Sequence, residues 1–278
     1  MTPADRPSVV IIGGPNGAGK STIAPRLLRD ALQVEEFVNA AVIARGLSAF
    51  NPEGVAVRAG RVMLERLREL AAQRARFAFE TTLASRSFAP WLRELTAGGY
   101  EFHCVSVWVT AADPCIQRIA DRVSRGGHHV PDDVVRRRYR SGWRNFFDLY
   151  RPLATTWRVY DNSGDAPAVV AEGERESVAI VIDRIRWSQI EDAPGAPRWR
   201  EAPRKREDLS RIGQIMLDGT AIDEAVRAAV RDAIVEHARD GAPIVIERDG
   251  RIVELPAEEI LREQAAREAR RAKHARWA

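Results

Sequence analysis

A glycine-rich segment near the start of the chain has the residue types needed to hold phosphate groups. It consists of Gly14, Pro15, Asn16, Gly17, Ala18, Gly19, Lys20, Ser21 and Thr22. The spacing Gly-x-x-x-x-Gly-Lys-Ser is that of a P-loop, and the segment directly follows an apolar run at residues 9–12. Glycines let backbone N–H groups face phosphate oxygens, Lys20 can reach the terminal phosphates, and the Ser21 hydroxyl can ligate Mg²⁺. We therefore expect a nucleoside triphosphate and Mg²⁺ to bind here.

Other motifs indicate which class of P-loop protein to expect. A switch-type GTPase would carry a base-reading motif, which the sequence does not show, and a motor ATPase would carry an apolar strand ending in an acidic partner for Mg²⁺. The apolar run at residues 102–109 instead continues into Thr110, Ala111 and Ala112. These features favour a small P-loop kinase, which works mainly by positioning its substrates and by placing arginines on the transferred phosphoryl group.

A carboxylate at the end of another apolar run could serve the phosphate acceptor. Glu80 follows residues 77–79, and open α/β sheets bind ligands at the carboxyl ends of their strands. Its carboxylate can accept hydrogen bonds from sugar hydroxyls, or it merely caps the following turn.

Guanidinium groups are concentrated around the loop at residues 126–128. They belong to Arg118, Arg122, Arg125, Arg136, Arg137 and Arg138. So many cations within about 20 residues repel one another unless anions or water spread the charge, which suits a lid that closes on phosphates. Residues 136–138 cannot share one face of a helix, so we expect one or two of them to point at the site. His128 is either a hydrogen-bonding residue of this lid or a structural one.

Short apolar runs alternate with longer amphipathic ones over residues 8–163, which predicts an α/β fold: a P-loop NTPase-type parallel sheet flanked by helices. Strands are expected at residues 9–12, 37–38, 77–79, 102–109 and 157–160. Helices are expected after Lys20 and at residues 52–73, 87–97, 114–124 and 131–149.

The composition changes after residue 190. We predict three parts: residues 1–190 as the P-loop domain, residues 191–204 as a Pro/Gly-rich linker, and residues 205–278 as a small α+β unit of helix, β-hairpin and helix. Thr220 is expected to cap the first helix, Asp249-Gly250 to form the hairpin turn between residues 244–246 and 252–255, and the last helix to begin near Pro256.

Composition excludes several classes of protein. The chain has 278 residues, 45% hydrophobic, and its 43 basic and 39 acidic residues leave a net charge of only +4, so nucleic acid is an unlikely partner. Its apolar runs are far shorter than the ~20 residues of a membrane helix, and its start has no secretory cleavage pattern. We expect a cytoplasmic protein without a membrane partner, and the two cysteines, Cys104 and Cys115, suit buried positions.

These motifs together resemble the zeta-toxin-like P-loop kinases of bacterial toxin–antitoxin systems. The resemblance covers about residues 9–163 and rests on the segments at 13–22, 37–40, 79–82, 122–128, 137–138 and 160–163. It implies ATP-dependent phosphorylation of a hydroxyl on a nucleotide sugar, typically the 3′-hydroxyl of the amino sugar in UDP-N-acetylglucosamine. By the same resemblance Lys20 and Ser21 bind ATP and Mg²⁺, and Arg122, Arg125 and Arg137 or Arg138 grip phosphates. The sugar would be held by Asn39, Glu80, Thr81, Thr82 and His128.

One position departs from the family pattern. The family's second strand continues from Phe-Val-Asn-Ala into an aspartate thought to accept the proton of the attacking hydroxyl, and Ala41 occupies that position. Loss of a positioned base costs ~10²- to 10⁴-fold in rate, so we expect a weakly active or inactive chain. Ala41 is either a deliberate substitution that disarms a toxic kinase, which the retention of the other motifs favours, or the natural residue of a pseudokinase.

Residues 205–278 loosely resemble the small proteins encoded beside such kinases. They could act as an antitoxin in cis, an antitoxin could act in trans, or the unit could serve dimerisation or partner docking. The alternative to a kinase is a non-catalytic ATP-binding pseudokinase or regulatory protein. A nucleic-acid 5′-kinase would need stacking aromatics along a basic groove, and the aromatics here are scattered.

Overall fold

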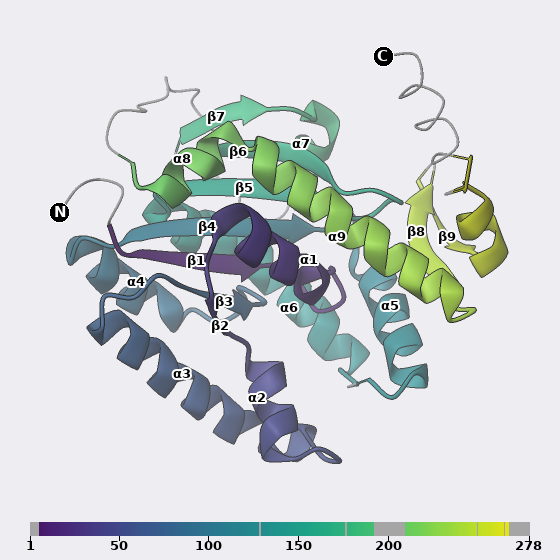
Figure 1. Cartoon of the computed structure of the whole chain (residues 1–278), viewed down its shortest axis with the longest axis horizontal. Coiled ribbons are helices and arrows are strands. Elements are labelled where there is room, and N and C mark those ends of the chain that lie inside the picture. The colour runs from purple at the N-terminus through teal and green to yellow at the C-terminus, as the bar shows by residue number, and fades with distance from the viewer. Residues whose placement is uncertain are drawn as a thin grey trace.

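The computed structural model describes residues 6–127, 129–175, 177–191, 209–248, 250–263 and 265–266. Its centre is a seven-stranded sheet in the order β2-β3-β1-β4-β5-β6-β7 (Figure 1). The first five strands are parallel: β2 (Glu36–Val38), β3 (Phe77–Thr81), β1 (Ser8–Gly13), β4 (Glu101–Trp108) and β5 (Thr156–Asp161). The predicted fold class, a largely parallel sheet flanked by helices, is confirmed.

Alternation along the strands divides the core into two layers. Val9 and Ile11 of β1 face one layer, and Val10 and Ile12 face the other, because successive side chains of a strand point to opposite faces. The first layer is covered by α3 (Ala56–Ala72), α4 (Phe88–Ala97), α6 (Asp132–Asn145) and α7 (Arg184–Glu191). The second is covered by α1 (Lys20–Arg26), α5 (Ala112–Ser124), α8 (Arg211–Asp218) and α9 (Thr220–Arg239).

Several elements lie outside the sequence prediction. These are α2 (Ala40–Leu47), α7, α8, and two antiparallel strands, β6 (Ala168–Glu174) and β7 (Ser177–Val181), which extend the sheet beyond β5. Short helical segments follow α1 (η2, Leu27–Leu32), precede α3 (η3, Glu53–Val55) and follow α6 (η4, Phe146–Tyr150, and η5, Arg151–Leu153). Of these, η3 falls within the helix predicted at residues 52–73 and most of η4 within the one predicted at 131–149. The apolar pattern of β6 is obscured by Glu172, which is buried against Arg158 with 2.6 Å between the charged groups.

The carboxyl-terminal elements pack on the same sheet as the rest of the chain. In Figure 1, α8 and α9 cross in front of the sheet beside α1, and the hairpin of β8 (Ile244–Arg248) and β9 (Arg251–Leu255) lies at the far end of α9. The predicted hairpin and following helix are present, but the predicted cap is wrong. Gly219 is the N-cap of α9 with φ 78°, and Thr220 is its first helical residue. The predicted linker falls largely on residues outside the described ranges.

A buried polar network fastens α9 to the sheet. The Tyr160 hydroxyl donates to an Asp223 carboxylate oxygen 2.5 Å away, and the Arg158 guanidinium lies 3.3 Å from the same carboxylate. Arg158 also donates to the carbonyl of Met216, at the end of α8, over 2.9 Å. Because Ile222 and Val226 of α9 belong to the core layer formed by β1 and α1, the helix is an integral cover of the sheet.

Candidate functional site

The phosphate loop has a backbone that glycine alone permits. Gly14, Gly17 and Gly19 have φ angles of 138°, 81° and 96°, a region that side chains with a Cβ rarely adopt. A Cβ added to Gly17 would lie 2.5 Å from the Cys115 carbonyl oxygen, and one added to Gly19 would lie 2.5 Å from Nδ2 of Asn162. The loop is therefore a tightly packed cradle of the glycine-rich kind that precedes a helix and binds phosphate in other proteins.

Lys20 is held inside this cradle. Its side chain is 5% exposed, its Nζ donates to the Pro15 carbonyl over 2.8 Å, and it lies 3.6 Å from the Glu80 carboxylate. Burial lowers the pKa of Lys20, and the neighbouring Glu80 opposes that shift. A phosphate would supply this buried cation with a second anionic partner.

Two side chains from separate parts of the chain donate to one carboxylate oxygen of Glu80. The Ser21 hydroxyl of α1 donates to Oε2 of Glu80 over 2.7 Å, and Nδ2 of Asn39 donates to the same oxygen over 3.0 Å. Hydroxyl and carboxylate oxygens suit Mg²⁺, which usually keeps several waters and binds one or two protein oxygens plus phosphate. No cluster of three or more His, Cys, Asp or Glu side chains suited to a metal occurs within the described residues.

The acidic side chain next to Ser21 comes from β3 and not from the end of β4. β3 pairs with β1 in a register that aligns Glu80 with Ile12, just before the phosphate loop. Sequence reasoning assigned Glu80 to the acceptor and did not consider it beside Ser21. The strand order that makes the two residues neighbours was the missing information.

Asn39 also determines where residue 41 lies. It is the N-cap of α2, and its Oδ1 accepts from the backbone N–H groups of Ala41 (2.8 Å) and Val42 (3.4 Å). Ala41 is therefore an exposed residue of the first turn of α2. Arg45, one turn later, lines the cavity described below and was missed, because no helix was predicted there.

Two further predicted acceptor residues, Thr81 and Thr82, follow Glu80 at the end of β3. Thr81 accepts a hydrogen bond from the Leu83 N–H in the turn after β3, and neither Thr81 nor Thr82 lines the cavity. His128 is outside the described residues.

The arginines separate into three groups. Arg122 and Arg125 of the α5 end line the cavity, and Arg138 of α6 donates to Oδ1 of Asn16 in the phosphate loop over 3.2 Å. Arg137 is exposed and does not line the cavity, and Arg136 is paired with Asp113. Burial lowers the pKa of Arg122, and the nearby charge of Arg45 lowers it further. An anion bound between these two cations would relieve their repulsion.

Arg118 makes hydrogen bonds to the hairpin and to the loop after β5. Its Nε donates to the Val245 carbonyl of β8 over 3.0 Å, and its Nη2 donates to the Ser163 carbonyl over 3.2 Å. Glu247 of β8 pairs with the Thr110 hydroxyl, and its N–H donates to the Ser163 carbonyl. These bonds hold the hairpin beside the loop that follows β5.

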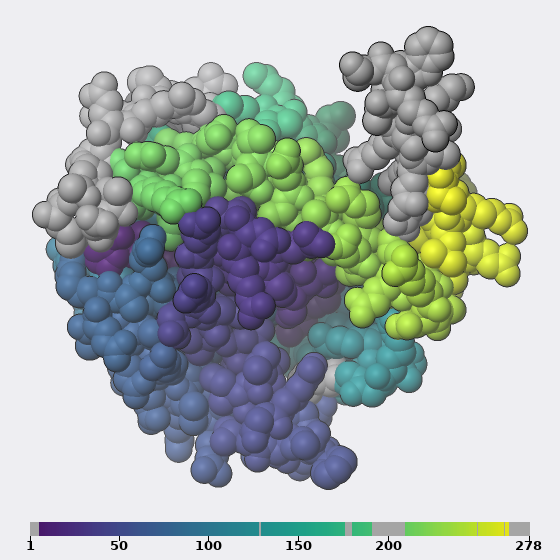
Figure 2. Space-filling view, in the orientation of Figure 1, coloured from purple at the N-terminus to yellow at the C-terminus, as the bar shows by residue number. Residues whose placement is uncertain are grey.

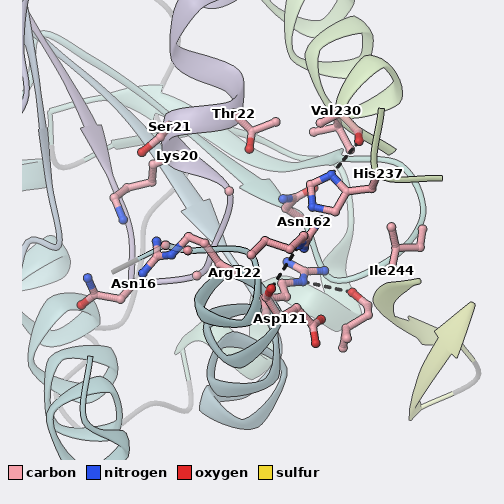
Figure 3. Close-up of a pocket in the computed structure, with 18 of the residues that line it drawn as sticks. Asn16, Lys20, Ser21, Thr22, Asp121, Arg122, Asn162, Val230, His237 and Ile244 are labelled. Carbon is pink, nitrogen blue, oxygen red and sulfur yellow. Dashed lines mark hydrogen bonds between the residues drawn. The ribbon is translucent and has the colours of Figure 1, made fainter. Parts of the chain in front are cut away.

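A cavity of about 960 Å³ joins these groups. Its walls are the phosphate loop, the end of α5, the segment after α2 and, from the carboxyl-terminal part, α9 and β8. Figure 2 shows the surface hollowed between the purple amino-terminal segment, the teal α5 and the green end of α9. In Figure 3, Lys20 and Arg122 lie on one side of it, and His237 and Ile244 on the other. This volume is at the upper end of the ~300–1,000 Å³ range of small-molecule sites.

Comparisons with known proteins agree with this architecture. Residues 9–142 match the family model described as AAA domain. An uncharacterized protein of Haemophilus influenzae is 29% identical over 126 residues, which cover 45% of this chain and 88% of that protein. Among solved structures, the AvrRxo1-ORF1:AvrRxo1-ORF2 complex with sulphate ions is similar with a TM-score of 0.57 at 14% identity, covering 82% of this chain and 76% of that one.

Two further structures extend the likeness. The same pair solved with ATP gives a TM-score of 0.55 at 13% identity, covering 81% of this chain and 80% of that one. The PezAT chromosomal toxin–antitoxin system of Streptococcus pneumoniae gives 0.50 at 15% identity, covering 79% and 87%. The chain has a P-loop kinase-like fold. In this fold a nucleotide binds at the phosphate loop, so the cavity beside Lys20 is the candidate active site.

Proposed function

We propose that this chain is a toxin-type, ATP-dependent kinase whose acceptor is a hydroxyl of a nucleotide sugar such as UDP-N-acetylglucosamine. The observation that carries the proposal is the meeting of Lys20, Ser21 and Glu80 at a phosphate cradle that shares one cavity with Arg122 and Arg125. The solved AvrRxo1 pair with ATP supports the donor, and the PezAT system supports the toxin class. With ATP as the donor, we also propose a cytoplasmic location.

The residues present fit ATP with Mg²⁺. Lys20 would neutralise the terminal phosphates, Ser21 and Glu80 would hold Mg²⁺, and Arg122, Arg125 and Arg138 would balance charge on the transferred group. Bound Mg²⁺ supplies a positive charge that polarises phosphate oxygens. Asn39 keeps the Glu80 carboxylate in place and fixes the start of α2.

The residue at position 41 determines the rate of phosphoryl transfer that we expect. Ala41 is an exposed residue on the first turn of α2, two residues after Asn39. By the family resemblance, a carboxylate at this position would accept the proton of the acceptor hydroxyl. Alanine has no proton acceptor, and the loss of a positioned base costs ~10²- to 10⁴-fold. We infer that the chain as it stands transfers phosphate slowly or not at all.

The test compares three full-length proteins: the chain itself, Ala41→Asp, and the matched control Val42→Asp on the adjacent exposed position. Each is incubated with ATP, Mg²⁺ and UDP-N-acetylglucosamine, and the sugar nucleotide is weighed by mass spectrometry. A gain of one phosphate with Ala41→Asp alone, at least ~100-fold above the chain itself, supports the proposal. No gain with any protein, in samples that bind ATP, would contradict it and favour the ATP-binding pseudokinase.

An inhibitory role for residues 205–278, in cis or as the counterpart of an antitoxin in trans, stays a prediction. The described part of this segment lies at the cavity, where it could either obstruct the nucleotide or help to bind it. These two roles predict opposite changes in ATP affinity.

A further inference from the structure

We propose that the carboxyl-terminal segment completes the nucleotide site: α9 and β8 bind the base of the donor, and His237 selects a purine that carries an amino group at C6, as adenine does, over one that carries a carbonyl there. The inference rests on the proposed function and adds to it the part of the chain that recognises the base. It assigns the segment a binding role instead of an inhibitory one.

The two ends of the cavity indicate where the base of a bound nucleotide would lie. The acceptor must approach the transferred phosphoryl group from the side opposite the leaving nucleotide, because the attacking and leaving oxygens are roughly in line. Glu80 and Arg45 lie toward β3 and α2, on the proposed acceptor side of the phosphate loop. The other end of the cavity, beyond Asn162, is bounded by α9 and β8. The base of a bound triphosphate would therefore reach these carboxyl-terminal elements.

The surface at that end suits a flat heterocycle. Val230 and Ile234 of α9, one turn apart, and Ile244 of β8 line the cavity with aliphatic side chains. Apolar walls with a few placed polar groups are the usual form of small-molecule sites. The hairpin that supplies Ile244 is held by Arg118, so this wall is part of the packed structure. The cavity remains open with both elements in position, which favours binding over obstruction.

His237 supplies the polar group. Its Nδ1 lies 2.9 Å from the Ala233 carbonyl oxygen, which can only accept, so Nδ1 carries the hydrogen. In the neutral ring Nε2 is then an acceptor, and Figure 3 shows this nitrogen directed toward the cavity and Asn162. An acceptor here pairs with the 6-amino group of adenine and disfavours guanine, which presents a carbonyl oxygen at the same position of the ring. Removal of a site's hydrogen-bonding partner is an effective basis for such discrimination.

The test is equilibrium binding by calorimetry at pH 8 with the full chain. The ligands are ATP, GTP and inorganic tripolyphosphate, which has no base. His237→Phe keeps a ring of similar size and removes the acceptor, Ile244→Ala shortens the apolar wall, and Glu236→Ala, an exposed neighbour on α9, is the control. Thermal unfolding of each variant verifies that it is folded.

The expected results separate the base site from the phosphate site. His237→Phe should weaken ATP binding about 2- to 10-fold, the range for one hydrogen bond, and bring ATP and GTP closer in affinity. Ile244→Ala should weaken ATP and GTP alike, and neither variant should change tripolyphosphate binding. Unchanged ATP binding in both folded variants, or tighter binding as expected of a cis-inhibitor, would overturn the inference. Failure of the unaltered chain to bind either ATP or tripolyphosphate would instead refute the proposed function.

Discussion

The guanidinium of Arg158 is the clearest point at which the stability of this chain can be tested. It is buried in β5, lies 2.6 Å from Glu172 of β6 and 3.3 Å from Asp223 of α9, and donates to the Met216 carbonyl at the end of α8. One side chain therefore joins two strands and two helices. Arg158→Met keeps much of the aliphatic volume but removes the cation opposite two carboxylates.

We expect Arg158→Met to lower the free energy of unfolding by ~3–5 kcal/mol, the cost of breaking a buried ion pair from one side. That is a large share of the ~5–15 kcal/mol available to a folded domain. Urea unfolding followed by tryptophan fluorescence and circular dichroism measures the loss. Trp157, the neighbour of Arg158 on β5, is buried and stacked on Trp187, so its emission should report on this region.

A double-mutant cycle that combines Arg158→Met with Glu172→Gln isolates the interaction energy between these two side chains from the other effects of each substitution. Once Arg158 is absent, neutralising Glu172 should cost less than it does in the intact chain, by at least ~1 kcal/mol. Costs that add within ~0.5 kcal/mol would show that the two groups do not interact, and the reasoning from their 2.6 Å contact would be refuted.

Three further predictions concern the site and its surroundings. Burial raises the pKa of Cys104 to about 12 and that of Cys115 to about 11, so at pH 8 neither side chain forms the reactive thiolate. Mass spectrometry should therefore find iodoacetamide adducts of these cysteines only after denaturation. Rapid labelling of the folded chain would contradict this. Lys20→Met should weaken ATP binding ~10- to 100-fold in calorimetry, because it removes a charged hydrogen-bond donor; an unchanged affinity would exclude Lys20 from the site. Asn39→Ala should cost ~1 kcal/mol of unfolding free energy in urea titrations, and Asn39→Ser should cost less, since serine also caps a helix and both variants lose the hydrogen bond to Glu80. Equal losses would argue against the capping role.

The core of the fold could be predicted from local patterns. The runs around residues 9–12, 77–79 and 102–109 are apolar because both faces of a parallel strand are covered by helices, and the structure confirms strands there. β6 was missed because the buried charge of Glu172 interrupts its apolar pattern, and β7 was missed because it is a short strand at the edge of the sheet. Helix α2 was missed because its start depends on one capping residue, Asn39, within a short segment.

In the candidate site, too, some features can be predicted from local sequence and others depend on how distant segments pack. A phosphate loop is recognisable in a sequence because its glycines, lysine and serine are adjacent, and their backbone conformation is local. The choice among Arg136, Arg137 and Arg138 is not local: Arg138 reaches Asn16 because α6 packs next to the loop, while its neighbours face solvent or Asp113.

The sequence by itself therefore determined the phosphate loop, the five parallel strands and the departure at Ala41, since each depends on residues close together in the chain. Only the tertiary structure placed Glu80 against Ser21 and brought His237 and Ile244 to the wall of the same cavity. Those contacts join segments 59 or more residues apart, and they follow from strand order and helix packing, which no local pattern encodes.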